Sequence, residues 1–283
     1  MAKHILVTND DGVFAPGLFA LVQEMRKLGK VSILAPDRNW SGGGHVKTLD
    51  HALRVREVRL ADGTQAFASD GAPSDCVALA TLGYFQEPID LVVSGINAGA
   101  NLGHDVTYSG TVTAAMEAVI AGVPGVAVSL ETVESYVGEI DYGPAARAAG
   151  KVVRQVIEND LPPKRSSPAD EILFNVNVPF LPDEKIQGIR LTWQGLRVYH
   201  SRLDKRVDPR GKPYYWIGGD APTGVPEHGT DVGALAEGFI SVTPLQLDLT
   251  AYRVLANLNT WHWNESPVET TLLEVPQEVL DSQ

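Results

Sequence analysis

The sequence predicts an α/β protein with a mainly parallel sheet, followed by a strand-rich region. Over the first 130 residues, short apolar runs alternate with stretches whose apolar residues recur at helical spacing, which is the pattern of βαβ units. From Glu171 onward, apolar and polar residues alternate as in strands, and no convincing long helix is predicted before Ala251. A chain of 283 residues that is 44% hydrophobic can bury a sizeable core.

The first βαβ unit is predicted to be complete by residue 36. A strand at residues 4–7 precedes a helix that begins at Pro16, and Gly29 is the predicted end of that helix. A second buried strand at residues 31–35 ends at Pro36, and the three glycines at 42–44 exclude an immediate regular element after it.

The same alternation continues along the chain. We predict a weaker strand at 64–68, a helix at 73–82, a strongly apolar strand at 90–94, a helix at 111–121, a buried strand at 125–130 and a helix at 145–157. Prolines and serines at 161–168 predict an exposed connection. Beyond it, strands are expected at 174–178 and 240–243, with a long hairpin or arm between them.

Composition excludes several classes of protein. The chain has 23 Lys and Arg against 35 Asp and Glu, and its formal charge of -12 argues against a binder of genomic DNA. The single cysteine, Cys76, excludes an internal disulfide and zinc-finger chemistry, and it favours a cytoplasmic location. No stretch approaches the roughly 20 apolar residues of a membrane helix, and residues 9–11 interrupt the first apolar run too early for a signal peptide.

One segment has the opposite charge. Residues 185–212 contain eight basic side chains and only two acidic ones, Asp204 and Asp208. This run either draws polyanions such as oligonucleotides or polyphosphate toward a pocket, or forms a solvated arm whose arginines pair with the acidic body or with a neighbouring subunit. We favour the arm, because charge runs are commonly surface features.

Oxygen-bearing side chains follow three of the predicted strands. The first strand is followed by Thr8-Asn9-Asp10-Asp11-Gly12, the second by Asp37, Asn39 and Ser41, and the apolar strand at 90–94 by Gly95-Ile96-Asn97. The carboxyl ends of parallel strands meet at one edge of a sheet, where ligands bind. Carboxylate, hydroxyl and amide oxygens suit Mg²⁺ or Mn²⁺ rather than zinc.

The adjacent carboxylates have an alternative explanation. Consecutive residues of a continuing strand point to opposite faces, so Asp10 and Asp11 converge only if the chain turns, as Gly12 would allow. An Asx turn, or an Asp that caps the helix starting near Pro16, explains the local sequence equally well. The residues alone leave both explanations open.

A second candidate feature is the sequence Ser109-Gly110-Thr111, directly before the helix at 111–121. Free backbone N–H groups at a helix N-terminus, together with two hydroxyls, form an anion site suited to phosphate. Ordinary N-capping is the commoner role for such residues, and it is compatible with phosphate binding.

Familiar catalytic motifs are absent from the sequence. It has no P-loop, no G-x-G-x-x-G fingerprint, no Asp-x-Asp motif after the first strand and no G-x-S-x-G elbow. The seven histidines show no H-x-x-x-H spacing, although His45 and His104 lie in loops where they could transfer protons.

Taken in order, several motifs resemble the SurE family of 5′/3′-nucleotidases, or survival proteins. They are Leu6-Val7-Thr8-Asn9-Asp10-Asp11-Gly12, Ala35-Pro36-Asp37-Arg38 with Ser41-Gly42, Ser94-Gly95-Ile96-Asn97-Ala98-Gly99-Ala100-Asn101-Leu102-Gly103, and Tyr108-Ser109-Gly110-Thr111-Val112. The resemblance is dense over residues 3–130 and patchy to about residue 252.

The resemblance implies a Rossmann-like three-layer α/β/α core with a C-terminal hairpin region. It also implies a hydrolase of nucleoside 5′- and 3′-monophosphates, with one Mg²⁺ or Mn²⁺ per subunit, and activity on short polyphosphate is a further expectation. The expected metal ligands are Asp10, Asp11, Ser41 and Asn97. Asp10 and Asp11 are the expected catalytic residues, and Asn97, Ser109, Gly110 and Thr111 are expected to bind phosphate.

The resemblance also implies the organisation of the chain. We expect residues 1–170 to form the core, and residues 171–283 to form a strand-rich part with a projecting hairpin at about 185–230 and an oligomerising tail. The two parts are expected to make one structural domain. Family members form homodimers or homotetramers that exchange C-terminal segments, so the same assembly is expected here, without genomic DNA or a membrane as partner.

We expect water, rather than a serine, to attack phosphorus, with one of the two aspartates orienting or deprotonating it. An aspartyl-phosphate intermediate is an alternative route. A regulator that binds metal and nucleotide without turnover is an alternative function. A Rossmann-like metal-dependent deacetylase is another, but it would need histidine ligands that neither Thr8 nor Gly12 supplies.

Overall fold

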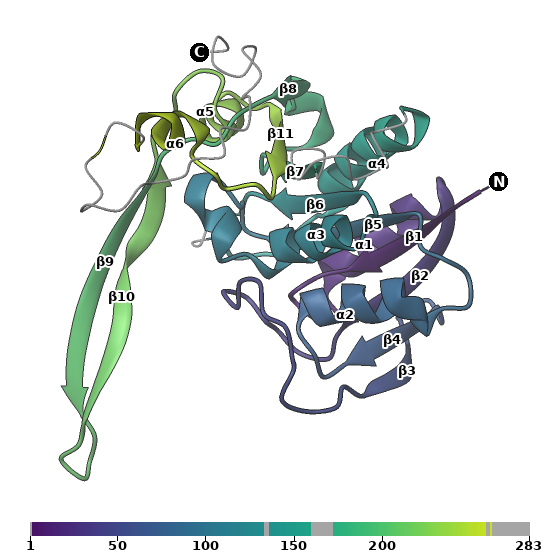
Figure 1. Cartoon of the computed structure of the whole chain (residues 1–283), viewed down its shortest axis with the longest axis horizontal. Coiled ribbons are helices and arrows are strands. Elements are labelled where there is room, and N and C mark those ends of the chain that lie inside the picture. The colour runs from purple at the N-terminus through teal and green to yellow at the C-terminus, as the bar shows by residue number, and fades with distance from the viewer. Residues whose placement is uncertain (1, 133–135, 160–171, 259–260, 262–283) are drawn as a thin grey trace.

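The computed structural model describes residues 2–132, 136–159, 172–258 and 261, and its centre is a nine-stranded sheet (Figure 1). The strands are β1 (Lys3–Thr8), β2 (Gly29–Pro36), β3 (Val55–Arg59), β4 (Gln65–Ser69), β5 (Leu91–Ala98), β6 (Gly125–Leu130), β7 (Ile172–Val178), β8 (Ile189–Leu191) and β11 (Ile240–Gln246). Their order is β3-β4-β2-β1-β5-β6-β7-β11-β8.

The sheet is mainly parallel, as predicted. The strands from β4 to β7 in that order run parallel, whereas β3 pairs antiparallel with β4 and β11 pairs antiparallel with β7. After β1 the chain adds β2 on one side of β1, and it later adds β5 on the other. This reversal of strand order creates a crevice beyond the carboxyl ends of β1 and β5.

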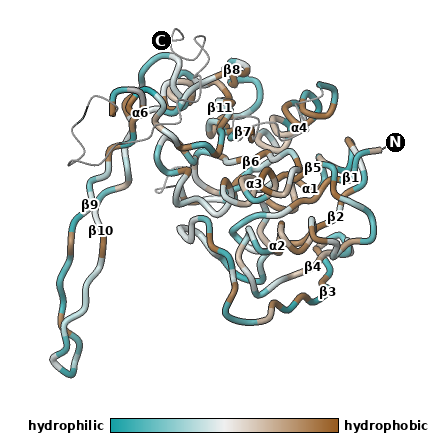
Figure 2. Tube along the Cα trace, viewed as in Figure 1, coloured by the Kyte–Doolittle hydropathy of each residue, from teal (hydrophilic) through white to brown (hydrophobic). Residues whose placement is uncertain are grey.

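Helices cover both faces of the sheet. Helices α1 (Pro16–Met25) and α4 (Gly143–Glu158) pack on the face that carries Ile5 and Val7. Helix α2 (Pro73–Leu79) and helix α3 (Gly110–Ile120) pack on the opposite face, where α2 meets Leu6. Figure 2 shows the hydrophobic residues concentrated in the central strands and these helices. The expected three-layer, Rossmann-like α/β/α core is confirmed.

Some boundaries differ from the prediction. Helix α1 ends at Met25, and Gly29 is the first residue of β2, because it pairs with Lys3 of the neighbouring strand. The predicted helix at 73–82 consists of α2 and a π-helical turn at Ala80–Tyr84. Strand β3 was not predicted, because its polar sequence has one buried residue, Val58.

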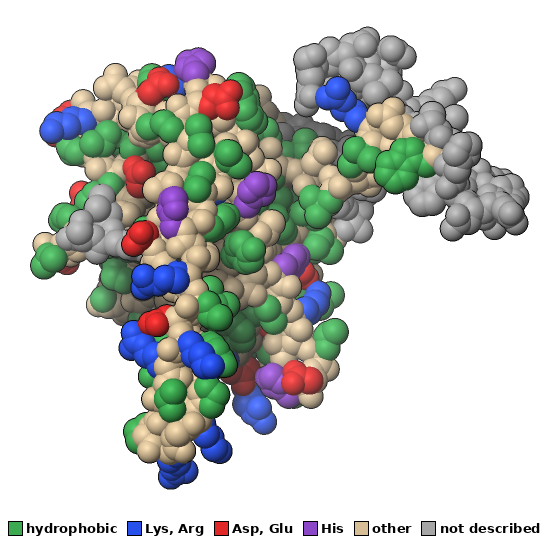
Figure 3. All heavy atoms as spheres, turned by 90° about the vertical axis from the view of Figure 1, so that its left-hand side faces the viewer, with side chains coloured by type: hydrophobic (Ala, Val, Ile, Leu, Met, Phe, Trp, Pro, Cys, Tyr) green, Lys and Arg blue, Asp and Glu red, His purple; other side chains and the backbone are tan. Residues whose placement is uncertain are grey.

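A two-stranded hairpin projects from the body (Figure 1). It consists of β9 (Arg197–Val207) and β10 (Pro213–Gly224), which pair antiparallel with each other. Figure 3 shows basic and hydrophobic side chains along this arm. The hairpin expected at 185–230 is therefore confirmed over 197–224, but β8, at the start of that range, joins the main sheet beside β11.

The remaining described helices are short. Helix α5 (Asp231–Ala236) precedes β11, and α6 (Tyr252–Leu258) follows it. None of the described helices is both long and apolar enough to cross a membrane. The connection expected at 161–168 and most of the expected oligomerising tail, residues 262–283, lie outside the described residues.

Candidate active site

The crevice beyond β1 and β5 contains a cavity of about 270 Å³. Its walls come from the loops after β1, β2 and β5, from the start of α3 and from β10. The lining residues are Asp10, Ser41, Gly42, Asn97, Ala98, Ala100, Asn101, Asp105, Tyr108, Ser109 and Pro222. The fold thus brings together Asp10, Ser41, Asn97 and Ser109, which the sequence placed at three strand ends and one helix start.

The chain turns sharply after β1, and Asn9 makes the turn. The Asn9 side-chain amide donates to the Gly12 carbonyl at 2.9 Å, and the Gly12 N–H donates to Asn9 Oδ1 at 3.2 Å. Gly12 has φ 108°, a conformation that favours glycine. Because the N-cap of α1 is Ala15, the alternative in which an Asp caps this helix is wrong. The sequence did show an Asn three residues before a Gly, but its role was missed.

Asp10 is buried against the start of α3. The Thr111 hydroxyl donates a hydrogen bond to Asp10 Oδ1, and this bond holds the carboxylate in one orientation. Burial raises the pKa of Asp10, although hydrogen bonds from Thr111 and Gly110 oppose the shift. The approach of the two segments requires glycine at 110, because a Cβ there would lie 2.7 Å from the Asp10 Cβ.

Asp11 is partly buried and lies beside Ser41. Burial, followed by the charge of Asp10, raises the pKa of Asp11 to about 6, although hydrogen bonds from the Ala98 backbone and the Ser41 side chain oppose this. Asn39, which was not among the predicted ligands, donates to Asp11 Oδ1 at 3.3 Å.

These residues fit a hard divalent cation. Both carboxylates have raised pKa values, so a cation placed between them would relieve the cost of burying two negative charges. Within the described part of the chain, no group of three or more His, Cys, Asp or Glu side chains could hold a metal ion. A cation here would therefore also need the hydroxyl of Ser41 and the amide oxygen of Asn97, which suit Mg²⁺ or Mn²⁺.

The loop that carries Ser41 bonds to the turn after β1 and to α3. The Trp40 N–H donates to the Asp10 carbonyl at 2.7 Å. Farther along the loop, Lys47 Nζ contacts Glu117 Oε1 of α3 at 2.7 Å, and His45 Nε2 contacts Glu117 Oε2 at 3.0 Å. Burial alone would raise the pKa of Glu117, but the hydrogen bonds and charges of these two partners lower it. His45, a candidate for proton transfer, thus holds the loop on α3.

Asn97 lies where β5 leaves its regular pairing with β6. The register shifts between Ser94 and Asn97, and the Asn97 side-chain N–H₂ donates to the Gly99 carbonyl at 2.7 Å. An amide held by its nitrogen presents its oxygen as the atom available to a ligand. The structure thus places Asn97 in the cavity with an orientation suited to a metal or a donor from substrate.

The loop after β5 is held from behind by β7. Asn175 and Asn177 are fully buried, and both donate to the Asn101 carbonyl, at 2.8 and 3.0 Å. Asn177 Oδ1 also accepts from the Asn101 N–H at 2.7 Å. These bonds give both buried N–H₂ groups a partner and fix the backbone of a cavity-lining residue.

Ser109 is the N-cap of α3 and also lines the cavity. Its hydroxyl accepts from the Val112 N–H at 3.1 Å, so the predicted capping role is confirmed. The N–H groups of Gly110 and Thr111 at the same helix end bond to Asp10, so the Ser109 hydroxyl is the group of this turn that lines the cavity. Gly110 and Thr111 are buried behind Ser109, against Asp10.

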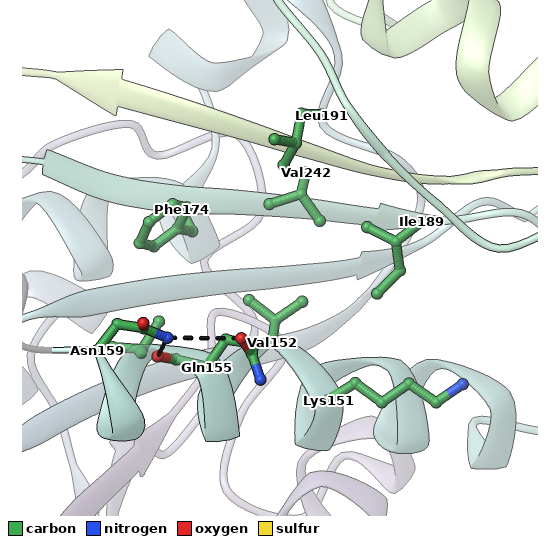
Figure 4. Close-up of a pocket in the computed structure, with 9 residues that line it drawn as sticks. Lys151, Val152, Gln155, Asn159, Phe174, Ile189, Leu191 and Val242 are labelled. Atoms are coloured by element: carbon green, nitrogen blue, oxygen red, sulfur yellow. Dashed lines mark hydrogen bonds between the residues drawn. The ribbon is translucent and has the colours of Figure 1, made fainter.

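A second cavity, of about 230 Å³, lies between α4 and the strands at the far edge of the sheet (Figure 4). Figure 4 shows Val152, Phe174, Ile189, Leu191 and Val242 around it, with Lys151 at its margin. Its lining has no carboxylate and no histidine. We therefore assign no catalytic chemistry to this cavity.

Comparisons with known proteins agree on one family. The model of the family described as "Survival protein SurE" matches residues 5–201. The chain is 49% identical to "5'-nucleotidase SurE" of Herpetosiphon aurantiacus, over 93% of this chain and 100% of the relative. It is 48% identical to the protein of the same name from Chloroflexus aggregans, over 92% and 99%. The solved structure of the SurE protein from Aquifex aeolicus superimposes with a TM-score of 0.74 at 40% identity, covering 91% and 98% of the two chains.

Proposed function

The chain belongs to the SurE survival-protein family, and on that premise we propose that this hydrolase is a metal-dependent phosphomonoesterase acting on nucleoside 5′- and 3′-monophosphates. Two relatives that match nearly the whole chain are named 5′-nucleotidases. The observation that carries the proposal is the cavity where Asp10, Ser41 and Asn97 meet Ser109 at the start of α3. An oxygen ligand set beside a helix N-terminus suits a phosphate ester together with a divalent cation.

Asp10, Asp11, Ser41 and Asn97 would hold one Mg²⁺ or Mn²⁺. When bound, such an ion offsets charge on the transferring phosphoryl group and lowers the pKa of water. The hydroxyl of Ser109 binds a remaining phosphate oxygen beside the first turn of α3, where the N–H groups of Gly110 and Thr111 bond to Asp10. Thr111 fixes the orientation of the Asp10 carboxylate. Asp11 is the more accessible of the two carboxylates, and we assign to it the orientation of the attacking water.

A phosphate-release assay tests the proposal. We expect the purified protein to release inorganic phosphate from 5′-AMP and 3′-AMP in Mn²⁺ or Mg²⁺, to lose this activity in EDTA and to regain it when Mn²⁺ is restored. Tripolyphosphate in the same assay tests the expected activity on short polyphosphate. Binding of AMP without phosphate release would instead support the non-catalytic regulator. Release that persists in EDTA would contradict the role of a metal.

We also propose a cytoplasmic homodimer or homotetramer with exchanged C-terminal segments. The arm supports an assembly, because Leu203, Trp216 and Ile217 are exposed on it and an isolated two-stranded hairpin is at best marginally stable in water. Sedimentation velocity is expected to give a mass of two or four chains. A monomer at micromolar concentration would contradict this proposal.

A further inference from the structure

The base of the projecting arm reaches the catalytic cavity. In the arm, Asp220 of β10 pairs with His200 and Thr223 pairs with Val198, so β10 contains one residue more than β9 between these pairs. The extra residue makes a β-bulge at Ala221 and Pro222, and Pro222 lines the same cavity as Asp10. Bulges redirect side chains. Proline, which has no N–H, is tolerated in a bulge because a bulged residue is not required to donate a hydrogen bond to the neighbouring strand.

The carboxylate of Asp105 bonds to two side chains at the base of the arm, Arg197 and Tyr199, and we call these three residues the clamp. Asp105 lies in the 3₁₀-helix η2 (Gly103–Thr107) and also lines the cavity. Arg197 Nε donates to Asp105 Oδ2 at 2.7 Å, and the Tyr199 hydroxyl donates to Asp105 Oδ1 at 2.7 Å. The side chains of Arg197 and Asp105 are only 15% and 17% exposed. This charged pair is therefore shielded from water. In such a place, removing one partner leaves the charge of the other buried and uncompensated.

A second carboxylate, that of Asp231, bonds to the backbone of the two segments that carry the clamp residues. Asp231 is fully buried at the start of α5, and its two oxygens accept from the Gly103 N–H at 2.8 Å and from the Gly195 N–H at 2.7 Å. Burial, followed by the adjacent Asp105, raises the pKa of Tyr199 to about 12, so this hydroxyl keeps its proton at neutral pH. The clamp is thus complete under ordinary conditions.

The cavity lining combines two kinds of chemistry. Asp10, Ser41, Asn97 and Ser109 present oxygen groups, which suit the cation and the phosphate. Ala100, Tyr108 and Pro222, which also line the cavity, are apolar or aromatic, and a phosphate gains nothing from such a surface. A large organic leaving group attached to the phosphate would bury its surface there.

We propose that the arm base, defined as Arg197–Tyr199 with the bulge at Ala221–Pro222, is the wall that binds the nucleoside part of the substrate, and that Asp105 is the positioning residue that holds it. This inference rests on the proposed function. The wall selects phosphomonoesters with a large leaving group, because Pro222 offers that group an apolar surface that the hydrolytic groups of the same cavity do not. Short polyphosphate has no such group and does not use this wall.

Three variants test the inference: Pro222→Ala removes the ring, and Asp105→Asn and Arg197→Met break the clamp. Each is expected to raise KM for 5′-AMP about tenfold or more while kcat stays within about twofold, because apolar contacts to a remote group act on binding. KM for tripolyphosphate is expected to stay within about twofold. If wild type binds AMP without hydrolysing it, the Kd of AMP from calorimetry in Mn²⁺ replaces KM.

The matched control is Arg147→Met, which breaks the exposed Arg147–Asp183 ion pair and leaves the cavity intact. It is expected to leave KM for AMP unchanged. Because breaking the clamp can unfold the chain, Pro222→Ala decides the matter if the other two variants fail to melt cooperatively. An unchanged KM for AMP in Pro222→Ala would overturn the inference, as would equal increases for AMP and tripolyphosphate. Failure of the proposed function would look different, since wild type would then release no phosphate from any substrate.

Discussion

Replacing Asp10 with asparagine is expected to lower the release of phosphate from 5′-AMP by at least about a hundredfold. Asp10 is the most buried of the proposed metal ligands, with 2% of its surface exposed, and it lies between the β1 turn and the start of α3. The amide keeps the shape of the carboxylate but removes the negative charge that would hold the cation. Initial rates at saturating AMP and Mn²⁺ measure the effect.

The fold of this variant is expected to remain intact. Burial raises the pKa of Asp10, which means that the charged carboxylate is costly to bury when no cation is present. A neutral asparagine avoids that cost, and the Thr111 hydroxyl can still donate to its Oδ1. The melting temperature in EDTA is therefore expected to be no lower than that of wild type.

The matched control for this experiment is Asp37→Asn. Asp37 follows β2 at the same edge of the sheet, but it is exposed and does not line the cavity. Its replacement is expected to leave activity within about twofold, as for surface substitutions away from a site. Undiminished metal-dependent turnover in Asp10→Asn would refute the assignment of this carboxylate.

Replacing Gly110 with alanine is the second change with a large expected effect. The new Cβ would lie 2.7 Å from the Asp10 Cβ and 2.9 Å from Asp10 Oδ2, so the carboxylate must move. Overpacking of this kind costs about 1–3 kcal/mol of the free energy of unfolding. A displacement of about 1 Å in a catalytic group costs about a hundredfold in rate. Urea unfolding and the AMP assay measure the two effects.

Gly218→Ala is the control for added volume. Gly218 lies in β10, and no described heavy atom lies within 4 Å of the position its Cβ would take. This variant is expected to keep wild-type stability within about 0.5 kcal/mol. If Gly110→Ala retained full activity, the close approach of α3 to Asp10 would have no part in positioning the carboxylate.

Hydrophobic periodicity was sufficient to predict most of the core. The strand predicted at 125–130 is β6 residue for residue, and the predicted helix at 145–157 lies within α4. The prediction worked there because β6 is a continuous apolar run that is buried on both faces, and because α4 buries one face against the sheet. It failed for Val55–Arg59 and Ile189–Leu191, which are strands at the two edges of the sheet and are held by pairing with a single neighbour.

The strand ends that carry the proposed ligands could be predicted from the sequence, because apolar residues change to polar ones there, and the family resemblance then selected Asp10, Asp11, Ser41 and Asn97 among them. The contacts that support these ligands could not be predicted. Asn9 and Asn39 act through bonds within or between loops, and Asp105 acts through Arg197, 92 residues away in the chain. Pro222 enters the cavity only because a bulge redirects it. No local pattern records a contact made by such distant segments.

The sequence by itself determined that Asn175 and Asn177 share one face of a strand, since alternate side chains point the same way. It did not determine whether that face meets water or protein. The tertiary structure decided this by placing the Asn101 loop over β7, where both amides are buried and bonded to it. Periodicity is a property of one segment, whereas burial depends on which other segments pack against it. For the same reason, the strand ends that carry the ligands could be predicted, whereas the contact of the arm with their cavity could not.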